Sequence, residues 1–312
     1  RNLDALPLPA WDLIDVKSYE QIWRKHHGYF SLNMATTRGC PFKCNWCAKP
    51  IYGNRYNSRS PKHVVEELSH LLEIAAPDHI WMCDDIFGLK PGWVQEFNEL
   101  LKKQHIRIPY KIQSRADLLL YEDTIDALCE SGLDEVWIGA ESGSQKILDA
   151  MDKGTTIEQI YKSTHILKSR HVKTCFFLQL GYPGENSEDI RMTKRMLSDL
   201  MPHDIGISVS YPLPGTKFYE KVKNDLKDKA NWTDSDDLDL MFQHEYSRKY
   251  YKKLHRHMHK FFRKRQAMAY LKSLFTSPLQ LNYRIMRAVL LGIFYYTPSL
   301  VISHYRLKQL EK

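Results

Sequence analysis

The sequence is poor in the features of disordered, fibrous and membrane-spanning chains. It has 14 glycines and 14 prolines among 312 residues, with 26% charged and 43% apolar or aromatic residues, which is an ordinary globular composition. It lacks a run of about 18 uncharged apolar residues, the length that a spanning helix needs. Because its longest apolar segment, residues 288–296, is followed by Thr297, Pro298 and Ser299, we predict that no helix of the chain spans a membrane.

Cysteine is also scarce, and its distribution argues against a secreted disulfide framework. There are six cysteines, of which Cys40, Cys44 and Cys47 lie within eight residues. Disulfide scaffolds are short chains that follow a signal peptide, and the sequence shows neither property. A reducing compartment and a metal or cluster site are therefore expected. The other three cysteines stand in apolar segments and are predicted to be core residues: Cys83, Cys129 and Cys175.

Acidic residues are nearly absent from the last fifth of the chain. Residues 246–312 carry 15 lysines and arginines but one acid, Glu311, which gives +14, whereas the preceding residues carry 30 basic and 36 acidic side chains, which gives −6. The basic region is expected to attract an anionic lipid surface, a nucleic acid or a carboxylated substrate. Nucleic acid is the least favoured of these, because the sequence shows no recognisable RNA-binding fold.

Short apolar strands alternate with amphipathic helices between residues 29 and 245. Strands are predicted at 29–37, 79–83, 110–113, 135–139, 172–180 and 204–210. Near-continuous apolar strands joined by helices are typical of a parallel sheet that is buried on both faces. Six units rather than eight predict an α/β fold, a partial (β/α)6 TIM-like barrel. Thr155 and Glu158 are predicted to form a capping box that opens a helix ending at Arg170.

The cysteine cluster has the spacing C-x3-C-x2-C directly after the first predicted strand. Three thiolates can hold three irons of a 4Fe–4S cube and leave the fourth iron without a protein ligand. An open metal position can bind a small molecule, as in catalytic zinc sites. Zinc, with a fourth ligand from His63 or from elsewhere, is the alternative. It is less favoured, because zinc sites usually have a second cysteine or histidine pair 12–20 residues away, and the sequence has none.

This motif, with Trp46 before its third cysteine, resembles the signature of the radical S-adenosylmethionine (SAM) superfamily, and the resemblance covers roughly residues 29–219. It implies a 4Fe–4S cluster on Cys40, Cys44 and Cys47, with SAM bound to the open iron by its amino and carboxylate groups. The reduced cluster would cleave SAM to methionine and a 5′-deoxyadenosyl radical. The resemblance also implies an electron donor such as flavodoxin or ferredoxin.

Polar residues follow the other predicted strands, at the barrel edge where active sites are built. Asp84 and Asp85 could instead cap a turn, and Arg115 could be a surface arginine. Glu141 and Ser142 could be a helix N-cap pair. By resemblance, residues 83–85 contact the SAM amino group, residues 139–144 and 151–154 match a GxESGS…MxKG stretch, and residues 180–185 match a GxPGE motif. The residues thus implied to bind SAM are Trp46, Asp84, Asp85, Arg115, Glu141, Ser142, Gln179, Gly181 and Gly184.

The branch with these motifs includes cobalamin-dependent methyltransferases, anaerobic magnesium-protoporphyrin monomethyl ester oxidative cyclases and methylthiotransferases. Methylthiotransferases end in a small β-barrel RNA-binding domain, and this chain ends in basic helical sequence instead. Residues 6–12 resemble the connector that follows a cobalamin-binding domain, and the first residue is Arg1 rather than Met. We therefore expect residues 1–28 to be a linker after such a domain, residues 29–245 to be the barrel, and residues 246–312 to be a basic helical appendage.

The resemblance implies methylation or oxidative cyclisation at an unactivated carbon of a small-molecule or lipid-like substrate, in the cytoplasm. The competing class is a non-enzymatic metal module whose basic tail binds nucleic acid. Such a module would not need Glu141, Gly181 and Gly184 on the rim that carries the cysteines.

The basic tail is predicted to pack on the barrel, to help cover its substrate side, and to make at most peripheral contact with the inner face of an anionic membrane. His255 and His259 are one helical turn apart and could share a metal, although a solvated basic helix is the favoured interpretation. The apolar positions predicted to face the barrel are Tyr250, Leu254, Phe261, Phe262, Met268 and Leu271.

Overall fold

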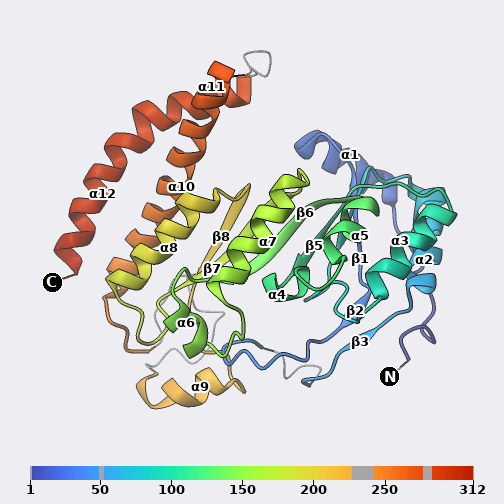
Figure 1. The fold of residues 1–312 in the computed structure, drawn as a ribbon, viewed down its shortest axis with the longest axis horizontal. Helices are drawn as coiled ribbons and strands as arrows, with labels where there is room; N and C mark the ends of the chain where they lie inside the picture. Colours follow the sequence, from blue (N-terminus) through green and yellow to red (C-terminus); the bar gives the residue numbers. More distant parts are fainter. Residues whose placement is uncertain (1, 49–52, 227–241, 277–282, 312) are drawn as a thin grey trace. The chain divides into compact units, whose positions relative to one another are not determined.

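A six-stranded sheet forms the centre of the computed structural model, which describes residues 2–48, 53–226, 242–276 and 283–311 (Figure 1). Its strand order is β1-β4-β5-β6-β7-β8, and the pairs β1/β4, β4/β5 and β5/β6 are parallel. The order is linear, with β1 and β8 at the two edges, so the sheet is open. The predicted α/β fold, a partial barrel of six units, is confirmed. The strands are β1 (Ser31–Met34), β4 (His79–Met82), β5 (Tyr110–Ser114), β6 (Leu133–Glu141), β7 (Lys173–Leu180) and β8 (Asp204–Val209).

Helices occupy the connections between the strands, as the alternating pattern predicted. A short antiparallel pair, β2 (Thr37–Arg38) and β3 (Asn57–Ser58), flanks the cysteine loop. The helices of the first part of the chain are η1 (Trp11–Leu13), α1 (Val16–His27), α2 (Pro61–Ala75), α3 (Trp93–Lys103), α4 (Ala116–Leu119), α5 (Thr124–Glu130), α6 (Gln145–Ala150), α7 (Ile157–Ser169), α8 (Ser187–Leu200), α9 (Lys217–Val222) and η3 (Lys223–Asp225).

The predicted capping box of α7 was wrong by one residue. Thr156, which has an extended backbone, accepts a hydrogen bond from the Gln159 backbone N–H, and the Gln159 side chain accepts one from the Thr156 N–H. Two adjacent threonines make the register ambiguous in the sequence, and backbone geometry selects the second one.

The prediction that three scattered cysteines are core residues holds only in part. Cys175 in β7 is buried, Cys129 in α5 is half-buried, and Cys83 is exposed. Cys83 follows the last residue of β4. The chain leaves the sheet at this residue, so the buried part of the apolar run ends at Met82, one residue before Cys83.

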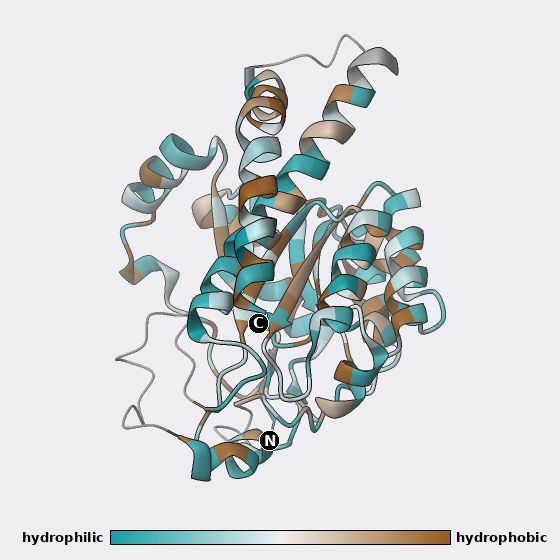
Figure 2. Ribbon diagram, turned by 90° about the vertical axis from the view of Figure 1, so that its left-hand side faces the viewer, coloured by the Kyte–Doolittle hydropathy of each residue, from teal (hydrophilic) through white to brown (hydrophobic). Residues whose placement is uncertain are grey.

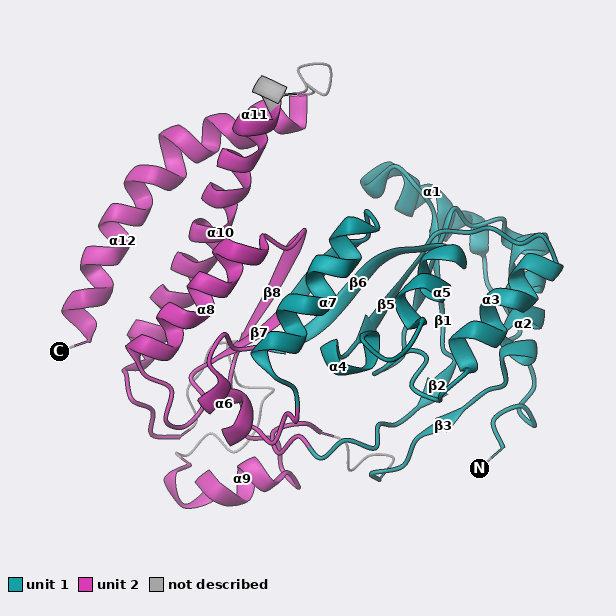
Figure 3. Cartoon of the chain, viewed as in Figure 1, with its two compact units in different colours: residues 1–43, 49–140, 155–176 teal, residues 44–48, 141–154, 177–312 magenta. Residues whose placement is uncertain are grey.

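The chain divides into two compact units (Figure 3). The first comprises residues 1–43, 49–140 and 155–176, and the second comprises residues 44–48, 141–154 and 177–312. In the first unit the N-terminal segment is held in place. Leu3 is buried, and the Asp4 carboxylate accepts a hydrogen bond from the Ser60 N–H at 2.9 Å. The predicted domain boundaries after residues 28 and 245 stay predictions.

The C-terminal region of the second unit is helical, as predicted, but its apolar segment was misjudged. Helices α11 (Tyr283–Leu291), η6 (Gly292–Tyr296) and α12 (Thr297–Leu310) form one run of 28 residues, which by length and composition could cross a membrane. The η6 segment is a π-helix, and the Thr297 N–H and hydroxyl both donate to the Gly292 carbonyl. This wider turn accommodates Pro298, so the helix continues where the sequence suggested an end.

Helix α10 (Arg248–Thr276) precedes this run and packs against α8 and β8. Tyr250, Leu254 and Phe262 are buried as predicted, whereas Phe261 and Leu271 are half-buried and Met268 is exposed. His255 lies 4.7 Å from His259 between ring centroids, and its Nε2 lies 3.2 Å from the Ile207 carbonyl oxygen. Within the described residues no third metal-ligating side chain joins these two histidines, and the favoured interpretation of a solvated basic helix stays a prediction.

Candidate functional site

The cysteine loop begins two residues after β2, where Gly39 has a φ of 81°. Cys40 is buried, Cys44 and Cys47 are half-buried, and none of the three is in a disulfide. The Cys47 N–H donates to the Cys44 carbonyl at 3.3 Å, which forms a turn between the two. Cys40 belongs to the first unit and the other two to the second, and within the described ranges no three cysteine, histidine or acidic side chains converge as a preformed metal site. The ligand assignment stays a prediction.

His63, the residue named for the zinc alternative, has other partners in the first unit. Its Nδ1 atom accepts a hydrogen bond from Arg59 Nε at 3.1 Å and lies 3.3 Å from the Asp4 carboxylate. Its backbone N–H donates to the side chain of Ser60, the N-cap residue of α2.

Asp84 and Arg115 both contact the segment that contains Cys40 within the first unit. The Asp84 carboxylate accepts hydrogen bonds from the Thr36 N–H (2.8 Å), the Thr36 hydroxyl (2.6 Å) and the Thr37 N–H (2.7 Å). Burial raises the pKa of Asp84, and these hydrogen bonds oppose that shift. Asp84 thus fixes the backbone that leads into Cys40. Asp85 is exposed.

Arg115 is buried, so its interpretation as a surface arginine was wrong. Its guanidinium makes a two-point contact with Asp117, at 3.0 and 3.1 Å, and stacks over the Phe42 ring with 3.7 Å to the ring centroid. Phe42 lies between Cys40 and Cys44. Arg115 is therefore a support for the cysteine loop.

Asn45 is the main polar anchor of the loop within the second unit, and the sequence analysis did not identify it. Its Nδ2 donates to the Ala150 carbonyl at 2.7 Å, and its Oδ1 accepts from the Tyr182 hydroxyl at 2.7 Å. Its backbone N–H donates to the Met151 carbonyl, and its carbonyl accepts from the Phe218 N–H. The cysteine loop is thereby tied to the two motif stretches around residues 151–154 and 180–185.

Trp46 joins the same anchor through apolar packing. It packs against a buried cluster in the second unit, and the Lys153 Nζ lies 5.9 Å from its ring centroid. The members of that cluster are Ile147, Met151, Tyr182, Phe218, Val222 and Phe242.

Glu141 ends β6 with an unusual backbone, since its φ is 55° although it is not a glycine. Its carboxylate lies 2.8 Å from the Lys153 ammonium, and both side chains are almost fully buried. A left-handed residue is strained by about 1–3 kcal/mol, and such residues cluster at functional sites. Lys153 stands in a recognised motif, but its pairing with Glu141 was not predicted.

Ser142 is fully buried, and its Oγ accepts a hydrogen bond from the Ser144 N–H at 3.1 Å. The N-cap position of α6 is Ser144, so the interpretation of Glu141 and Ser142 as the cap pair was wrong. The Gly143 N–H donates to Thr193 Oγ1 and the Ser144 hydroxyl donates to Asp189, which fastens this loop to α8.

The loop after β7 holds a buried carboxyl group. Gly181 has a φ of 76°, and its N–H donates to Glu185 Oε2 at 2.6 Å. Burial raises the pKa of Glu185 to about 8. Gly184 also has a positive φ, and its carbonyl accepts a hydrogen bond from Lys146. Glu185 belongs to a recognised motif but was not predicted as a site residue.

Several buried polar atoms in this region of the second unit lack a hydrogen-bond partner within the described part of the chain. They are Gln179 Oε1, Glu185 Oε1, Ser210 Oγ, His244 Nε2 and Trp46 Nε1. Native proteins leave few such atoms unpaired, and unpaired ones often mark the place of a ligand or water. Three of these residues follow or end strands β7 and β8, at the edge where barrel enzymes bind their ligands.

Comparison with known proteins identifies the class of this fold and site. Residues 34–197 match the family described as the Radical SAM superfamily. That match covers more than half of the chain, so the chain belongs to the radical SAM superfamily. The predicted resemblance is confirmed, and so is the prediction of an enzyme.

The relatives indicate the branch. The chain is 28% identical over 234 residues to an uncharacterized methyltransferase of Pyrococcus horikoshii, covering 74% of this chain and 50% of the relative. It is 26% identical over 227 residues to the anaerobic magnesium-protoporphyrin IX monomethyl ester cyclase of Rubrivivax gelatinosus, covering 71% and 39%. The chain thus spans half or less of the length of these curated relatives.

A solved structure shares the fold. The cobalamin-dependent S-adenosylmethionine radical enzyme OxsB, with aqua-cobalamin bound, matches with a TM-score of 0.63 and 18% identity, over 89% of this chain and 46% of that chain. The match supports the partial-barrel architecture and its helical C-terminal part.

Proposed function

We propose that this chain binds a 4Fe–4S cluster through Cys40, Cys44 and Cys47 and cleaves SAM reductively. The observation that carries the proposal is the Asn45 anchor, which joins the cysteine loop to two motif stretches more than 100 residues away. The residues fit the cofactors, because none of the three cysteines is in a disulfide and unpaired polar atoms lie at the ends of β7 and β8. When bound, the reduced cluster supplies the electron that breaks a carbon–sulfur bond of SAM.

The protein's own contribution is to hold and orient these groups. Arg115, stacked on Phe42, and Asp84, bonded to Thr36 and Thr37, fix the two ends of the segment that contains Cys40. We assign Glu141, with Lys153 beside it, to the polar end of SAM. The turn from Gly181 to Gly184 is assigned to its adenosine, since a positive φ brings backbone close to a ligand without a side chain between them.

The finer activity is proposed from the relatives. A methyltransferase, a cyclase and a cobalamin-dependent enzyme all share this part of the chain. We infer a cobalamin-associated methylation or oxidative cyclisation of a small-molecule or lipid-like substrate, with cobalamin held outside these 312 residues. An electron donor such as flavodoxin or ferredoxin would reduce the cluster, in the cytoplasm or at the inner face of the membrane.

The test is anaerobic reconstitution of the protein with iron and sulfide. We expect about four irons per chain and 5′-deoxyadenosine formation from SAM with a reductant. Replacing Cys40, Cys44 and Cys47 together by alanine should abolish both. Cys129→Ala is the matched control, because this thiol lies in α5, outside the cysteine motif and the stretches assigned to SAM. Four irons retained in the triple variant would show that the cluster has other ligands.

A further inference from the structure

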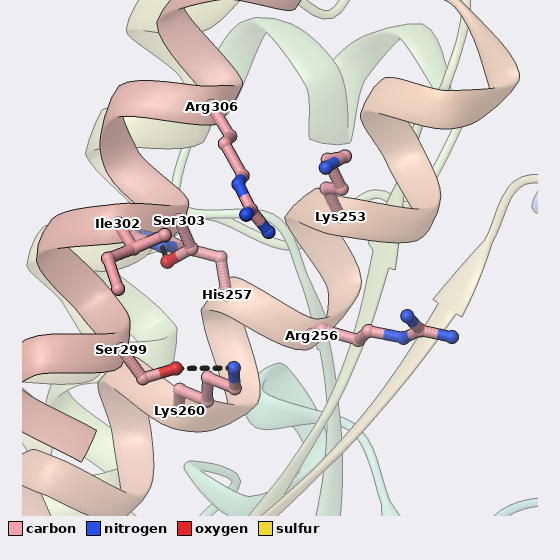
Figure 4. A pocket seen from close by; sticks show the side chains of 8 residues that line it. All are labelled: Lys253, Arg256, His257, Lys260, Ser299, Ile302, Ser303 and Arg306. Atoms are coloured by element: carbon pink, nitrogen blue, oxygen red, sulfur yellow. Dashed lines mark hydrogen bonds between the residues drawn. The ribbon is translucent and has the colours of Figure 1, made fainter. Parts of the chain in front are cut away.

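A basic pocket lies between α10 and α12 in the second unit (Figure 4). Its volume is about 300 Å³, and the side chains that line it include no acid. Figure 4 shows Arg306 of α12 reaching between the two helices on the side of Lys253. The lining residues are Lys253, Arg256, His257, Lys260, Ser299, Ile302, Ser303 and Arg306.

Among the residues that the structure describes, no carboxylate forms an ion pair with the cations of this pocket. Within the described part of the chain, Lys253, Arg256 and Arg306 make no ion pair, and Lys260 donates to the Ser299 hydroxyl at 2.6 Å. Four positive side chains around one hollow repel one another unless an anion lies among them. Arginine and lysine together suit a phosphate group, which accepts several charge-assisted hydrogen bonds at once.

Hydrogen bonds of a buried histidine hold the inner wall of the pocket together. His257 is buried, its Nε2 lies 3.2 Å from Lys194 Nζ, and its Nδ1 lies 2.7 Å from Ser303 Oγ. A lysine can only donate, so Nε2 accepts and Nδ1–H donates to the serine. Burial, with Lys194, His304 and Lys260 nearby, lowers the pKa of His257 to about 4. The histidine is therefore neutral at physiological pH and fixes α10 to α12.

An exposed apolar face runs along α11 and η6, which lead into α12, one of the two helices that line the pocket. Tyr283, Met286, Leu290 and Phe294 are spaced three or four residues apart, so they share a face, and they are 75%, 47%, 50% and 74% exposed. Val301, Ile302 and Tyr305 continue the exposed apolar surface on α12, and hydrophobic residues recur along these helices in Figure 2. Ile302 also lines the pocket. Contiguous exposed apolar surface of this extent marks an interaction site.

The neighbouring helix decides how this surface can meet a membrane. Helix α10 carries ten lysines and arginines in 29 residues, and it is bonded to α12 through His257 and Lys260. Charged side chains at the bilayer centre are costly. With α10 attached, the run Tyr283–Leu310 cannot span the bilayer, but it can lie in the interface with its apolar face among the acyl chains.

We propose that α10, α11 and α12 form an interfacial docking element for anionic membranes, in which the pocket of Lys253, Arg256, Lys260 and Arg306 binds a phospholipid phosphate. The charge of +14 in residues 246–312 complements such a surface. This inference does not depend on the radical chemistry, so either can fail alone.

The test is sedimentation of the whole protein with vesicles of phosphatidylcholine alone and of phosphatidylcholine with phosphatidylglycerol. We expect binding to the anionic vesicles only, weakened by 0.5 M salt. The double variant Lys253→Gln/Arg306→Gln should bind about thirtyfold more weakly, since each cation near the surface contributes about fivefold. Phe294→Ser should also weaken binding, through the apolar face.

The control variant Lys62→Gln/Arg195→Gln removes the same charge from two cations whose side chains are 77% and 78% exposed. It should bind as the unchanged protein does. An equal loss of vesicle binding in both double variants would show that only the net charge matters. It would overturn the assignment of the pocket as the phosphate site. Three further results would overturn the proposal. The first is binding to neutral vesicles alone, and the second is pocket-dependent binding of free phosphate or RNA without binding to vesicles. The third is full vesicle binding by Lys253→Gln/Arg306→Gln with an unchanged melting temperature.

Discussion

At the scale of single residues, the candidate site depends on side chains that pair across long stretches of sequence. Asn45 uses its amide group and its backbone to join residues 150–152, Tyr182 and Phe218 to the loop between Cys44 and Cys47. Glu141 and Lys153 form a buried pair in the same unit. The motifs containing most of these residues were recognisable in the sequence. Their pairings were not, because Asn45 and Tyr182 are 137 positions apart and no local pattern links them.

Replacing Asn45 by alanine should destabilise the protein by about 1–3 kcal/mol. The change removes two hydrogen bonds of the Asn45 amide group, to the Ala150 carbonyl and from the Tyr182 hydroxyl, each worth about 0.5–1.5 kcal/mol. The Tyr182 hydroxyl keeps its own hydrogen bond to the Ala150 carbonyl at 2.9 Å, so neither group is left unpaired. Urea unfolding of the two proteins measures the difference. Tyr182→Phe, which removes only the hydroxyl, should cost less. Equal stability of all three proteins would show that the anchor is not structural.

Glu141→Gln should both weaken SAM binding and destabilise the fold, since it leaves the Lys153 ammonium buried without its partner. Breaking a buried pair from one side costs about 3–5 kcal/mol. Calorimetric titration of the reconstituted variant with SAM tests binding, and its iron content should be unchanged. The double variant Glu141→Gln/Lys153→Met should regain stability but not SAM affinity. Unaltered SAM affinity in both variants would remove Glu141 from the site.

Glu185 should make stability fall as the pH rises. Its folded-state pKa of about 8 lies above its ordinary value of 4.5, so its contribution is fully present below about pH 4.5 and is lost as pH rises through about 8. Gly181, Asp189, Lys146 and Tyr251 are the groups that act on it or feel its charge. Glu185→Gln should flatten this dependence by an amount on the order of a few kcal/mol between pH 5 and 9. Chemical unfolding at several pH values measures it, and parallel pH profiles would contradict the assignment.

At the scale of helices and strands, the sequence predicted well which elements exist and predicted less well the residues at which they end. All six strands of the sheet lie where near-continuous apolar runs stand, because strands buried on both faces leave a clear pattern. The end of the apolar segment at Pro298 was misread, since a π-helical turn accommodates the proline. Cap register and π-turns depend on backbone geometry, which residue types alone do not determine.

The loop between β6 and α6 should tolerate no side chain at Gly143. A Cβ there would lie 2.5 Å from the Met192 carbonyl oxygen and 2.6 Å from the Thr193 Cα, and both are backbone atoms of α8. Gly143→Ala should therefore cost about 1–3 kcal/mol by overpacking. Gly28→Ala is the control, because its Cβ would meet nothing within 4 Å and only the φ of 83° opposes it. Thermal unfolding compares them, and a smaller loss at Gly143 than at Gly28 would contradict the close approach.

At the scale of the whole molecule, the charge asymmetry marks residues 246–312 as a basic helical appendage, and α10 within it has a large buried face. Five of its large side chains are buried: Tyr250, Tyr251, Leu254, Met258 and Phe262. His255 also contacts the Ile207 carbonyl oxygen in β8, and Arg263 pairs with Asp204 at 2.9 Å. A basic composition describes the exposed face of a helix, and the buried face of α10 is part of the second unit's core.

A chain that ends at Glu245 should therefore not fold to a stable protein. Each of the five buried side chains contributes about 1.5–3 kcal/mol, and their sum is comparable with the whole stability of a typical domain, about 5–15 kcal/mol. A chain that ends at Thr276 keeps α10 and loses only helices with few buried residues, so it should fold and lose vesicle binding. Soluble expression and thermal unfolding of the two truncated chains separate these outcomes. A chain ending at Glu245 that unfolds at the same temperature as the full chain would show that α10 lies outside the core, because a helix that contributes its apolar face to the core cannot be removed without loss of stability.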